Sequence, residues 1–363
     1  MDATAVQESG GGLSTYATAL VAGWHAAFPG DELVVVVGGP GGARFLRSVT
    51  SDVRLPKLAR SRFITQQLVP VVARATRPDA IFSLVPGVPL MPVGVPIVSV
   101  VHDLRSWMRP DEFPPWIRAY RRAAHHHAFH RSDRIIAVSE RSRLDLERVC
   151  RRGALRAHVV HPAADHVDAW DSLPRTRHVV TFGHWSNKRP DWAIQTWAKA
   201  VRAAAAPPEW KLHVVGVPEA GRGALAEAAA ELGAADSVIV HGYLPVTEYQ
   251  RLFTSAAAVL MLSTFEGFGL PVIEAMRRGV HVIASGDPAL QEAGGTSAVY
   301  VDDEAGLLRA LVAVFVDHPD VRALVRSGLR RTQRMTWAAA AAETRAVIQG
   351  AIAGSDTTAD RVS

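Results

Sequence analysis

Two glutamates and two glycines in the second half of the chain have the spacing of a ligand-binding loop. Glu266 and Glu274 are eight residues apart, and Gly267 and Gly269 lie between them. An apolar run ends just before this loop, and a helical pattern that opens with Pro271 follows it, which predicts a strand, a loop and a helix. Backbone N–H groups at a helix start attract anions, and carboxylates accept hydrogen bonds from sugar or ribose hydroxyls. The alternative is an ordinary helix start with one dipole-stabilising glutamate.

This loop and the sequence after it resemble one enzyme family. The string EGFGLPVIEAM, which begins at Glu266, is similar to the E-x7-E signature of retaining glycosyltransferases with the GT-B fold (group 1, glycosyltransferase family 4-like). Residues 279–284 (GVHVIA) and 290–292 (LQE) are similar to that family's G-x-P-V-I and A-L-P-E segments, with His281 and Gln291 where proline is usual. The resemblance covers nearly the whole second half of the chain.

The resemblance implies a role for each residue of the loop. In that family the first glutamate contacts the hydroxyls of the donor sugar, and the second holds the ribose of the nucleotide. These roles fall on Glu266, which is then a catalytic-site residue, and on Glu274. Backbone contacts to the sugar and the phosphates fall on Phe268, Gly269 and Leu270.

A second loop carries two adjacent cations after the predicted strand at 179–182. Gly183 and His184 begin this loop, and Lys188 and Arg189 end it. A lysine at the mouth of a strand–loop–helix unit can neutralise a diphosphate as a point charge; the alternative is a surface cation pair that opens a helix. The family has a similar loop with two cations, and Lys188 matches the second. His184 stands where an arginine is usual, so either Arg189 substitutes for it or the clamp is weaker and pH-sensitive.

Near the N-terminus, three glycines precede a predicted helix. Backbone N–H groups of such a loop can form an anion nest, although a flexible N-terminal tail is an equal alternative. The segment resembles the family's first-domain Gly-Gly loop, which lies over the donor phosphates and the acceptor. The resemblance implies donor contacts for Gly11 and Gly12 and an acceptor contact for Tyr16. Only residues 1–6 precede the loop, which predicts a short first strand.

A histidine and an aspartate follow the apolar run at 97–101. His102 and Asp103 therefore lie at the carboxyl end of a buried strand, where doubly wound sheets bind ligands; structural capping is the alternative. The family has the same pair, with the histidine near the reacting sugar. The resemblance implies that His102 orients the donor sugar in the catalytic site and that Asp103 faces the acceptor.

Three other segments are weaker candidates. Residues 38–43 are rich in glycine but contain a proline and lack a dinucleotide fingerprint, so we interpret them as a turn. His126 and His130 are four residues apart without an H-E-x-x-H motif, which favours a solvated basic helix face over a metal site. The basic segment 57–77 is either a membrane-surface helix or an amphipathic helix with a solvated face. Nucleic-acid motifs are absent, so we expect no nucleic-acid partner.

Composition bounds the class of protein. The chain has 363 residues, of which 48% are hydrophobic and 21% charged, so it can bury the cores of about two domains. Residues 1–178 carry 23 Lys and Arg against 16 Asp and Glu (net +7), whereas residues 179–363 carry 17 against 19 (net −2). This asymmetry favours an anionic partner for the first half, such as a membrane surface. One cysteine excludes an internal disulfide, and the N-terminus lacks a signal-peptide pattern, so we expect a cytoplasmic protein, peripheral at the membrane if bound to it.

The pattern of apolar runs predicts an α/β fold with two domains built on parallel sheets. The resemblance implies that these are Rossmann-like, doubly wound domains facing a central cleft, the GT-B arrangement. Ten strands are expected, at residues 33–37, 80–85, 97–101, 134–138, 179–182, 212–215, 238–240, 258–262, 281–284 and 299–301. The expected divisions are an acceptor-facing domain over 1–165, a nucleotide-sugar domain over 166–336, a helix over 337–354 that returns to the first domain, and a flexible tail over 355–363.

The expected activity follows from the resemblance. It is transfer of a mannose- or glucose-type hexose from a nucleotide-diphosphate sugar to the hydroxyl of a carbohydrate, glycolipid or other acceptor, with retention. No cofactor is expected, and the lack of an Asp-x-Asp motif predicts that no metal is required. The alternatives are a nucleotide-sugar epimerase or hydrolase on the same fold and a non-catalytic nucleotide-sugar-binding protein. A dinucleotide-dependent dehydrogenase would need a glycine fingerprint that residues 38–43 do not supply.

Overall fold

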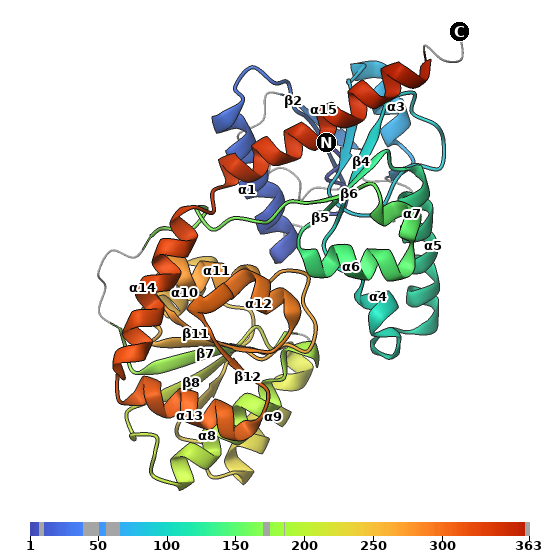
Figure 1. Cartoon of the computed structure of the whole chain (residues 1–363). Helices are drawn as coiled ribbons and strands as arrows, with labels where there is room; N and C mark the ends of the chain where they lie inside the picture. Colours follow the sequence, from blue (N-terminus) through green and yellow to red (C-terminus); the bar gives the residue numbers. More distant parts are fainter. Residues whose placement is uncertain (7–10, 39–50, 56–65, 170–174, 185, 360–363) are drawn as a thin grey trace. The chain divides into compact units, whose positions relative to one another are not determined.

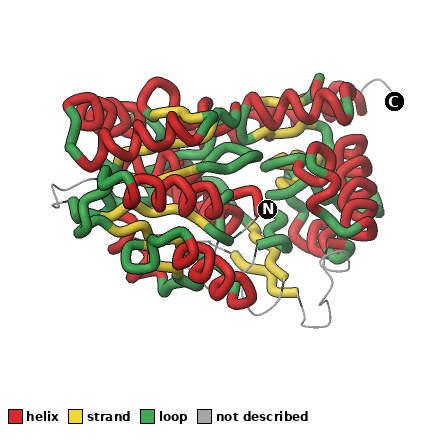
Figure 2. The backbone as a smooth tube through the Cα atoms, turned by 90° about the horizontal axis from the view of Figure 1, so that it is seen from below, coloured by secondary structure: helices red, strands yellow, loops and turns green. Residues whose placement is uncertain are grey.

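The computed structural model describes residues 1–6, 11–38, 51–55, 66–169, 175–184 and 186–359. The chain divides into two compact units: unit 1 comprises Met1–Ala163 and Thr336–Ser363, and unit 2 comprises Ala164–Met335. In each unit the strands are flanked by helices (Figure 1 and Figure 2). Most of the glycine-rich turn predicted at 38–43 and the first part of the basic segment 57–77 lie outside the described residues.

The described part of unit 1 contains parallel strands only. They are β1 (Val34–Gly38), β2 (Ser51–Leu55), β3 (Ile81–Ser83), β4 (Ile97–Val101), β5 (Arg134–Ala137) and β6 (Ala157–Val159). β1 pairs with β2, and β3, β4, β5 and β6 form a four-stranded sheet in that order. His102 follows β4 directly, so the sheet fixes the position of this predicted site residue.

The first residues of the chain lie between β1 and β3. Asp2 forms parallel bridges to both Val36 and Ser83, and its N–H donates to the Phe82 carbonyl at 2.7 Å. Its carboxylate accepts hydrogen bonds from the Thr4 N–H at 3.0 Å and the Ser83 hydroxyl at 3.4 Å. The short first strand that the sequence predicts is therefore a bridge-forming segment that joins β1 to β3, in the position that precedes the glycine-rich loop.

The helices of unit 1 include one from each end of the chain. They are α1 (Gly12–Ala27), α3 (Val69–Thr76), α4 (Arg105–Met108), α5 (Pro115–Arg131), α6 (Glu140–Val149), α7 (Arg151–Ala154) and α15 (Trp337–Ala359), with a 3-10 turn η2 (Pro110–Glu112). α1 and α15 pack closely because Gly23 has no side chain: a Cβ there would overlap the backbone of Trp337. A bidentate ion pair between Arg345 and Asp31, at 2.7 and 2.9 Å, also joins α15 to the loop that follows α1. None of the described helices has the length and apolar character needed to cross a membrane.

The terminal helix is longer than the sequence predicts. The expected end was residue 354, followed by a flexible tail, but α15 continues to Ala359. A single glycine at position 354 weakens a helix by only about 1 kcal/mol, and no proline follows it. Because adding a residue to an existing helix is far easier than starting one, the Ser-Asp-Thr-Thr run extends the helix instead of ending it.

Unit 2 is built on a six-stranded parallel sheet. The strands are β7 (His178–Phe182), β8 (Lys211–Val215), β9 (Val238–Val240), β10 (Ala258–Met261), β11 (His281–Ser285) and β12 (Val299–Val301). Their order across the sheet is β12-β11-β10-β7-β8-β9. The strand order therefore reverses between β7 and β10, and ligands of doubly wound sheets bind beyond the carboxyl ends of the strands at such a point.

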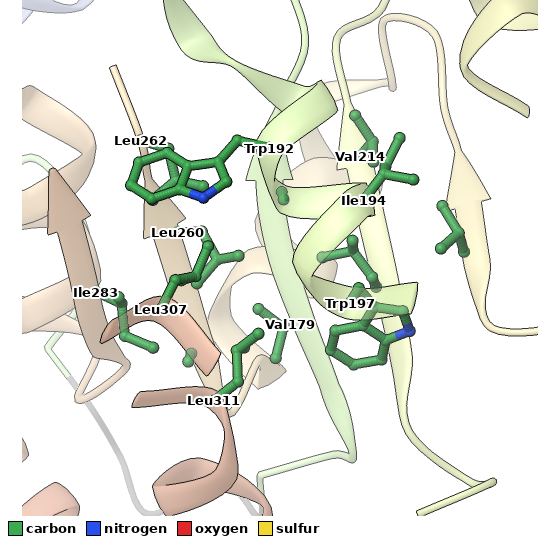
Figure 3. Packing of buried hydrophobic residues seen from close by; sticks show 14 of the residues in the cluster. Val179, Trp192, Ile194, Trp197, Val214, Leu260, Leu262, Ile283, Leu307 and Leu311 are labelled. Atoms are coloured by element: carbon green, nitrogen blue, oxygen red, sulfur yellow. The ribbon is translucent and has the colours of Figure 1, made fainter. Parts of the chain in front are cut away.

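Helices cover both faces of this sheet. They are α8 (Pro190–Arg202), α9 (Glu219–Glu231), α10 (Val246–Ser255), α11 (Leu270–Arg277), α12 (Pro288–Gly294), α13 (Glu304–Phe315) and α14 (Pro319–Gln333), with 3-10 turns η3 (Ser186–Lys188) and η4 (Gly295–Ser297). On one face Trp197 of α8 and Leu311 of α13 pack against Val179 and Leu260 of the strands (Figure 3). α10 lies on the other face, where its Phe253 contacts Phe182.

The ten predicted strands are confirmed to within two residues at each end. They were readable because strands buried on both faces are continuous apolar runs. β2 and β6 were missed. β2 has the sequence SDVRL, which is not an apolar run, and β6 is three residues long and only partly buried.

A buried histidine makes unit 2 acid-sensitive. His281, at the start of β11, is 2% exposed, and burial lowers the pKa of its imidazole from 6.5 to about 4. Between these values the unfolded chain binds a proton that the folded chain does not, so stability is complete above 6.5 and falls as the pH drops towards 4. From about pH 7.5 to about pH 5 this histidine removes about 2 kcal/mol of unfolding free energy.

Between these two pH values we therefore expect the unfolding free energy of His281→Leu to fall by about 2 kcal/mol less than that of the wild type. Denaturant unfolding of both proteins at the two pH values measures it. Some acid sensitivity remains in the variant because burial also lowers the pKa of His178, His213 and His241. Equal pH dependence of the two proteins would contradict the prediction.

Candidate functional site

The loops that follow β7 and β10 are bound to each other at the point where the strand order reverses. The Thr264 N–H donates to the Asn187 carbonyl at 2.8 Å, and the Asn187 side-chain amide donates to the Phe265 carbonyl at 2.9 Å. Asn187 is 5% exposed. Sequence reasoning missed it because its partners lie 78 residues away. These bonds hold the two loops that carry the predicted donor residues in one arrangement.

Lys188 and Glu266, predicted separately, form an ion pair across these loops. The Lys188 ammonium lies 2.6 Å from Glu266 Oε1, and the two side chains are only 9% and 16% exposed. The ammonium also lies 6.0 Å from the centre of the Phe182 ring. A pair this sheltered from water interacts strongly, and each charge offsets the cost of burying the other.

The other predicted residues of the loop after β7 make contacts within unit 2, and their donor contacts stay predictions. Gly183 allows close packing, because a Cβ there would lie 2.6 Å from Val217 Cγ2. His184 is half-buried beside the Phe182 ring. Arg189 precedes α8 with a left-handed backbone (φ 51°), and its guanidinium lies over the Trp192 ring at 4.5 Å. The arginine therefore stacks on its own helix.

The glycine turn before α11 brings the backbone close to the helix start. Gly269 has φ 104°, which favours glycine, and a Cβ there would lie 2.7 Å from Leu290 Cδ2. Phe268 is 5% exposed and Leu270 is half-buried at the first helical position. With the Phe268 side chain in the core, the backbone N–H groups at the start of α11 are the polar groups that this turn offers to a ligand.

Glu274 has two cationic or polar partners that sequence reasoning missed. His166 Nε2 lies 3.0 Å from Glu274 Oε1, and Arg278 Nη1 lies 3.9 Å from Glu274 Oε2. Arg278 is 6% exposed; burial lowers the pKa of its guanidinium, and the Glu274 carboxylate opposes that shift. Arg278 could have been found as the i+4 neighbour of Glu274 on a helix. His166 could not, because 108 residues separate it from Glu274.

In unit 1, His102 is held by the loop after β3 and by an aromatic neighbour. Its Nε2 lies 2.9 Å from the Leu84 carbonyl oxygen. The Tyr16 ring meets the His102 ring edge-on at 4.7 Å and the Trp337 ring at 5.4 Å. Tyr16 is 2% exposed, and burial raises the pKa of its hydroxyl well above the ordinary value. Tyr16 therefore packs against His102 inside unit 1, and its acceptor contact stays a prediction.

The other predicted residues of unit 1 lie at helix starts. Asp103 is exposed, and its carboxylate accepts a hydrogen bond from the Arg105 N–H at 3.0 Å, at the beginning of α4. Gly11 and Gly12 are exposed at the beginning of α1, and Gly11 has φ 101°. The positions of these groups agree with either a capping role or a ligand contact.

No group of three or more histidine, cysteine, aspartate or glutamate side chains is arranged to hold a metal ion within the described ranges. The rings of His126 and His130 lie 4.2 Å apart, tilted by 35°, on the exposed side of α5. Metal independence stays a prediction.

Comparisons with known proteins agree with this geometry. A model described as "Glycosyltransferase Family 4" matches residues 10–168, and one described as "Glycosyl transferases group 1" matches residues 176–317. The chain is 35% identical over 130 residues to an MMP alpha-(1->4)-mannosyltransferase of Mycolicibacterium hassiacum, which covers 34% of this chain and 32% of that protein. It is 30% identical over 181 residues to a D-inositol 3-phosphate glycosyltransferase of Segniliparus rotundus, covering 45% and 38%.

These matches span about a third of the length of the curated relatives. Solved structures align over far more of the chain. That of Anabaena HepE in complex with UDP and glucose aligns over 93% of this chain and 96% of that one, with a TM-score of 0.69 and 16% identity. Together with other solved glycosyltransferases that overlap the whole fold, it assigns the GT-B fold to the two Rossmann-like units. The two family models and this shared fold establish that the chain belongs to the group 1, family 4 glycosyltransferases.

Proposed function

We propose that this protein transfers a hexose from a nucleotide-diphosphate sugar to an acceptor hydroxyl with retention at the anomeric carbon. The observation that carries the proposal is the sheltered pair between Lys188 and Glu266, 2.6 Å apart at the reversal of strand order. It puts a cation for a diphosphate beside a carboxylate for sugar hydroxyls, next to the start of α11. The family membership and the activities in the names of the curated relatives support the same reaction.

The chemistry rests on stabilising the charge of the leaving group. The donor diphosphate takes the place of Glu266 on the Lys188 ammonium, and the N–H groups at the start of α11 neutralise further charge. The displaced carboxylate of Glu266 then accepts hydrogen bonds from the sugar hydroxyls. The bond from the anomeric carbon to the diphosphate oxygen breaks, and the acceptor oxygen bonds to that carbon on the same face. The departing phosphate takes the acceptor proton, and His102 orients the donor sugar.

The names of the relatives support the proposed substrate classes. A mannose- or glucose-type sugar fits the mannosyltransferase and the structure bound to UDP and glucose. The second relative acts on inositol 3-phosphate, as its name states. We extend this to an acceptor of the carbohydrate or glycolipid class.

The reaction is tested with a panel of uridine and guanosine diphosphate sugars and a mixture of acceptors, and the anomeric configuration of the product is read by NMR. A retained configuration in an acceptor-dependent product is the expected result. Turnover without acceptor would instead indicate a hydrolase or epimerase, and donor binding without turnover would indicate a sensor.

Activity should survive removal of divalent cations. Lys188 and the start of α11 supply the charge that a metal would otherwise supply, so saturating chelator is expected to leave the initial rate within about twofold. Initial rates with chelator and with added Mg²⁺ measure it. Activity that is lost on chelation and restored by Mg²⁺ would overturn the metal-free mechanism.

The proposed partners include an anionic membrane surface, and α5 supports it. Its 17 residues contain four arginines and four histidines and no acidic residue. Trp116 and Tyr120, one helical turn apart, are 73% and 45% exposed. Exposed aromatic rings on a helix that lacks acidic residues fit the interface of a bilayer with anionic headgroups.

We expect the double variant Trp116→Ser/Tyr120→Ser to bind vesicles of phosphatidylglycerol and phosphatidylcholine about tenfold more weakly, measured by co-sedimentation at low salt. Tyr243→Ser is the matched control, since Tyr243 is 72% exposed in unit 2. Equal binding of the double variant and the wild type would exclude α5 as the membrane face. A Trp116-dependent dimer in solution would point to a second copy of the chain instead.

A further inference from the structure

His166 lies outside the motifs that identify the family, in the segment that begins unit 2, yet it contacts a motif residue directly. Its Nε2 lies 3.0 Å from Glu274 Oε1, and the two side chains are 15% and 13% exposed. Nothing in the E-x7-E signature requires a histidine at this position. The effect of this contact on Glu274 follows from its geometry.

The segment that carries His166 is bound to the same helix as Glu274. The Arg277 guanidinium donates to the Val167 carbonyl at 2.9 Å, and the Ala164 N–H donates to the Met335 carbonyl at 3.3 Å. Val167 is itself 8% exposed. The backbone on either side of His166 is thus anchored, so the imidazole is presented to α11 in a fixed position.

Glu274 is bounded on its other side by Arg278. Nη1 of Arg278 lies 3.9 Å from Glu274 Oε2, and the guanidinium, 6% exposed, stacks over the Phe253 ring at 5.3 Å. One carboxylate oxygen of Glu274 therefore faces the His166 imidazole, and the other faces the buried Arg278 guanidinium. A carboxylate has about four lone-pair positions, so this arrangement leaves positions for a ligand while it fixes the carboxylate rotation.

We infer that His166 is a positioning residue for Glu274 and sets the affinity of the site for the ribose hydroxyls of the donor nucleotide. The inference rests on the proposed function, in which Glu274 holds the ribose. A fixed carboxylate binds a pair of neighbouring hydroxyls without first losing rotational freedom, whereas a freely rotating one does not. Loss of the His166 contact therefore weakens recognition of the ribose, and the contacts to the diphosphate are unchanged.

The test compares nucleotides with and without those hydroxyls. Uridine and guanosine 5′-diphosphates and the 2′,3′-dideoxy form of each are titrated into the wild type and into His166→Leu by calorimetry. The wild type is expected to prefer the ribose form of its nucleotide by about 10- to 100-fold, the size of one or two hydrogen bonds to a charged group. In His166→Leu this preference falls to within about threefold, and the dideoxy form binds as it does to the wild type.

Two further variants separate positioning from a general structural role. His166→Gln keeps a side-chain N–H donor at similar reach and is expected to restore most of the preference. His318→Leu is the matched control: His318 also lies in unit 2, where its side chain accepts the Asp320 N–H at 3.3 Å. This variant keeps the wild-type preference. The readout is the ratio of two affinities measured on one protein, so a partial loss of folded protein leaves this ratio unchanged.

The outcomes distinguish the inference from the function on which it rests. If the wild type prefers the ribose form and His166→Leu prefers it equally, the positioning role is wrong and the proposed function stands. If the wild type binds the ribose and dideoxy forms equally, the assignment of Glu274 to the ribose is wrong, and the inference falls with it. Absence of binding by all four nucleotides overturns both.

Discussion

Lys188→Ala is expected to lower kcat by about 10²- to 10³-fold, the effect of removing one preorganised group that stabilises developing charge. The ammonium lies 2.6 Å from Glu266 in a site where both side chains are largely shielded from water. In the proposed reaction it receives the negative charge of the departing diphosphate, so its removal acts mainly on the transition state. Initial rates over a range of donor concentrations separate kcat from KM.

Lys199→Ala is the control for this experiment. Lys199 lies on α8, eleven residues after Lys188, where it pairs with Glu304, and its side chain is 51% exposed. Its removal is expected to leave kcat within about twofold because exposed ion pairs contribute little. The variant Lys188→Ala/Glu266→Gln removes both charges of the buried pair. If it recovers wild-type turnover, Lys188 only compensates the Glu266 charge; unchanged turnover in Lys188→Ala alone would also eliminate the diphosphate role.

Trp197→Ala is expected to lower the unfolding free energy of unit 2 by about 3 to 5 kcal/mol, the usual cost of emptying a large aromatic site in a core. Trp197 is completely buried, its ring meets Phe315 edge-on at 5.4 Å, and its indole N–H donates to the Ser237 hydroxyl at 3.0 Å. The variant leaves a cavity, and the Ser237 hydroxyl loses the indole donor while it still donates to the Ala234 carbonyl at 3.2 Å. Because α8 follows the Lys188 loop directly, donor binding weakens as well.

Denaturant unfolding followed by circular dichroism measures this loss. The matched control is Trp116→Ala, the same substitution at a site that is 73% exposed on α5, with an expected change of at most about 0.5 kcal/mol. A loss below about 1 kcal/mol in Trp197→Ala would contradict the assignment of α8 to the core of unit 2.

The sequence predicts those parts of the fold in which burial requires a continuous run of apolar residues. β10 and β11 are buried on both faces and are continuous apolar runs, so their bounds were predicted to within a residue. β2 carries aspartate and arginine and was missed. The predicted end of α15, at residue 354, was wrong because the polar residues after Gly354 are compatible with both a helix and a coil.

The candidate site was predictable one residue at a time but not as a set of contacts. Lys188, Glu266 and Glu274 stand out because each lies in a local motif. Their partners depend on which strands are adjacent, and neither periodicity nor spacing carries that information. The order of strands in the sheet places Lys188 beside Glu266, which is 78 residues away in the sequence. The segment that begins unit 2 places His166 beside Glu274, which is 108 residues away. Nor did the position of Tyr16 in its motif reveal that its ring is buried against His102.

The return of α15 to α1 has a consequence for the order in which the protein is built. A ribosome finishes all of unit 2 before it makes the helix that packs on Gly23 and pairs with Asp31. Domains generally fold as units during synthesis. Unit 2 can therefore fold while translation continues, whereas unit 1, though begun first, stays incomplete until α15 has been made. Unit 1, which carries the exposed aromatic rings of α5, is completed after unit 2, so a nascent chain can hold a folded unit 2 before unit 1 is complete.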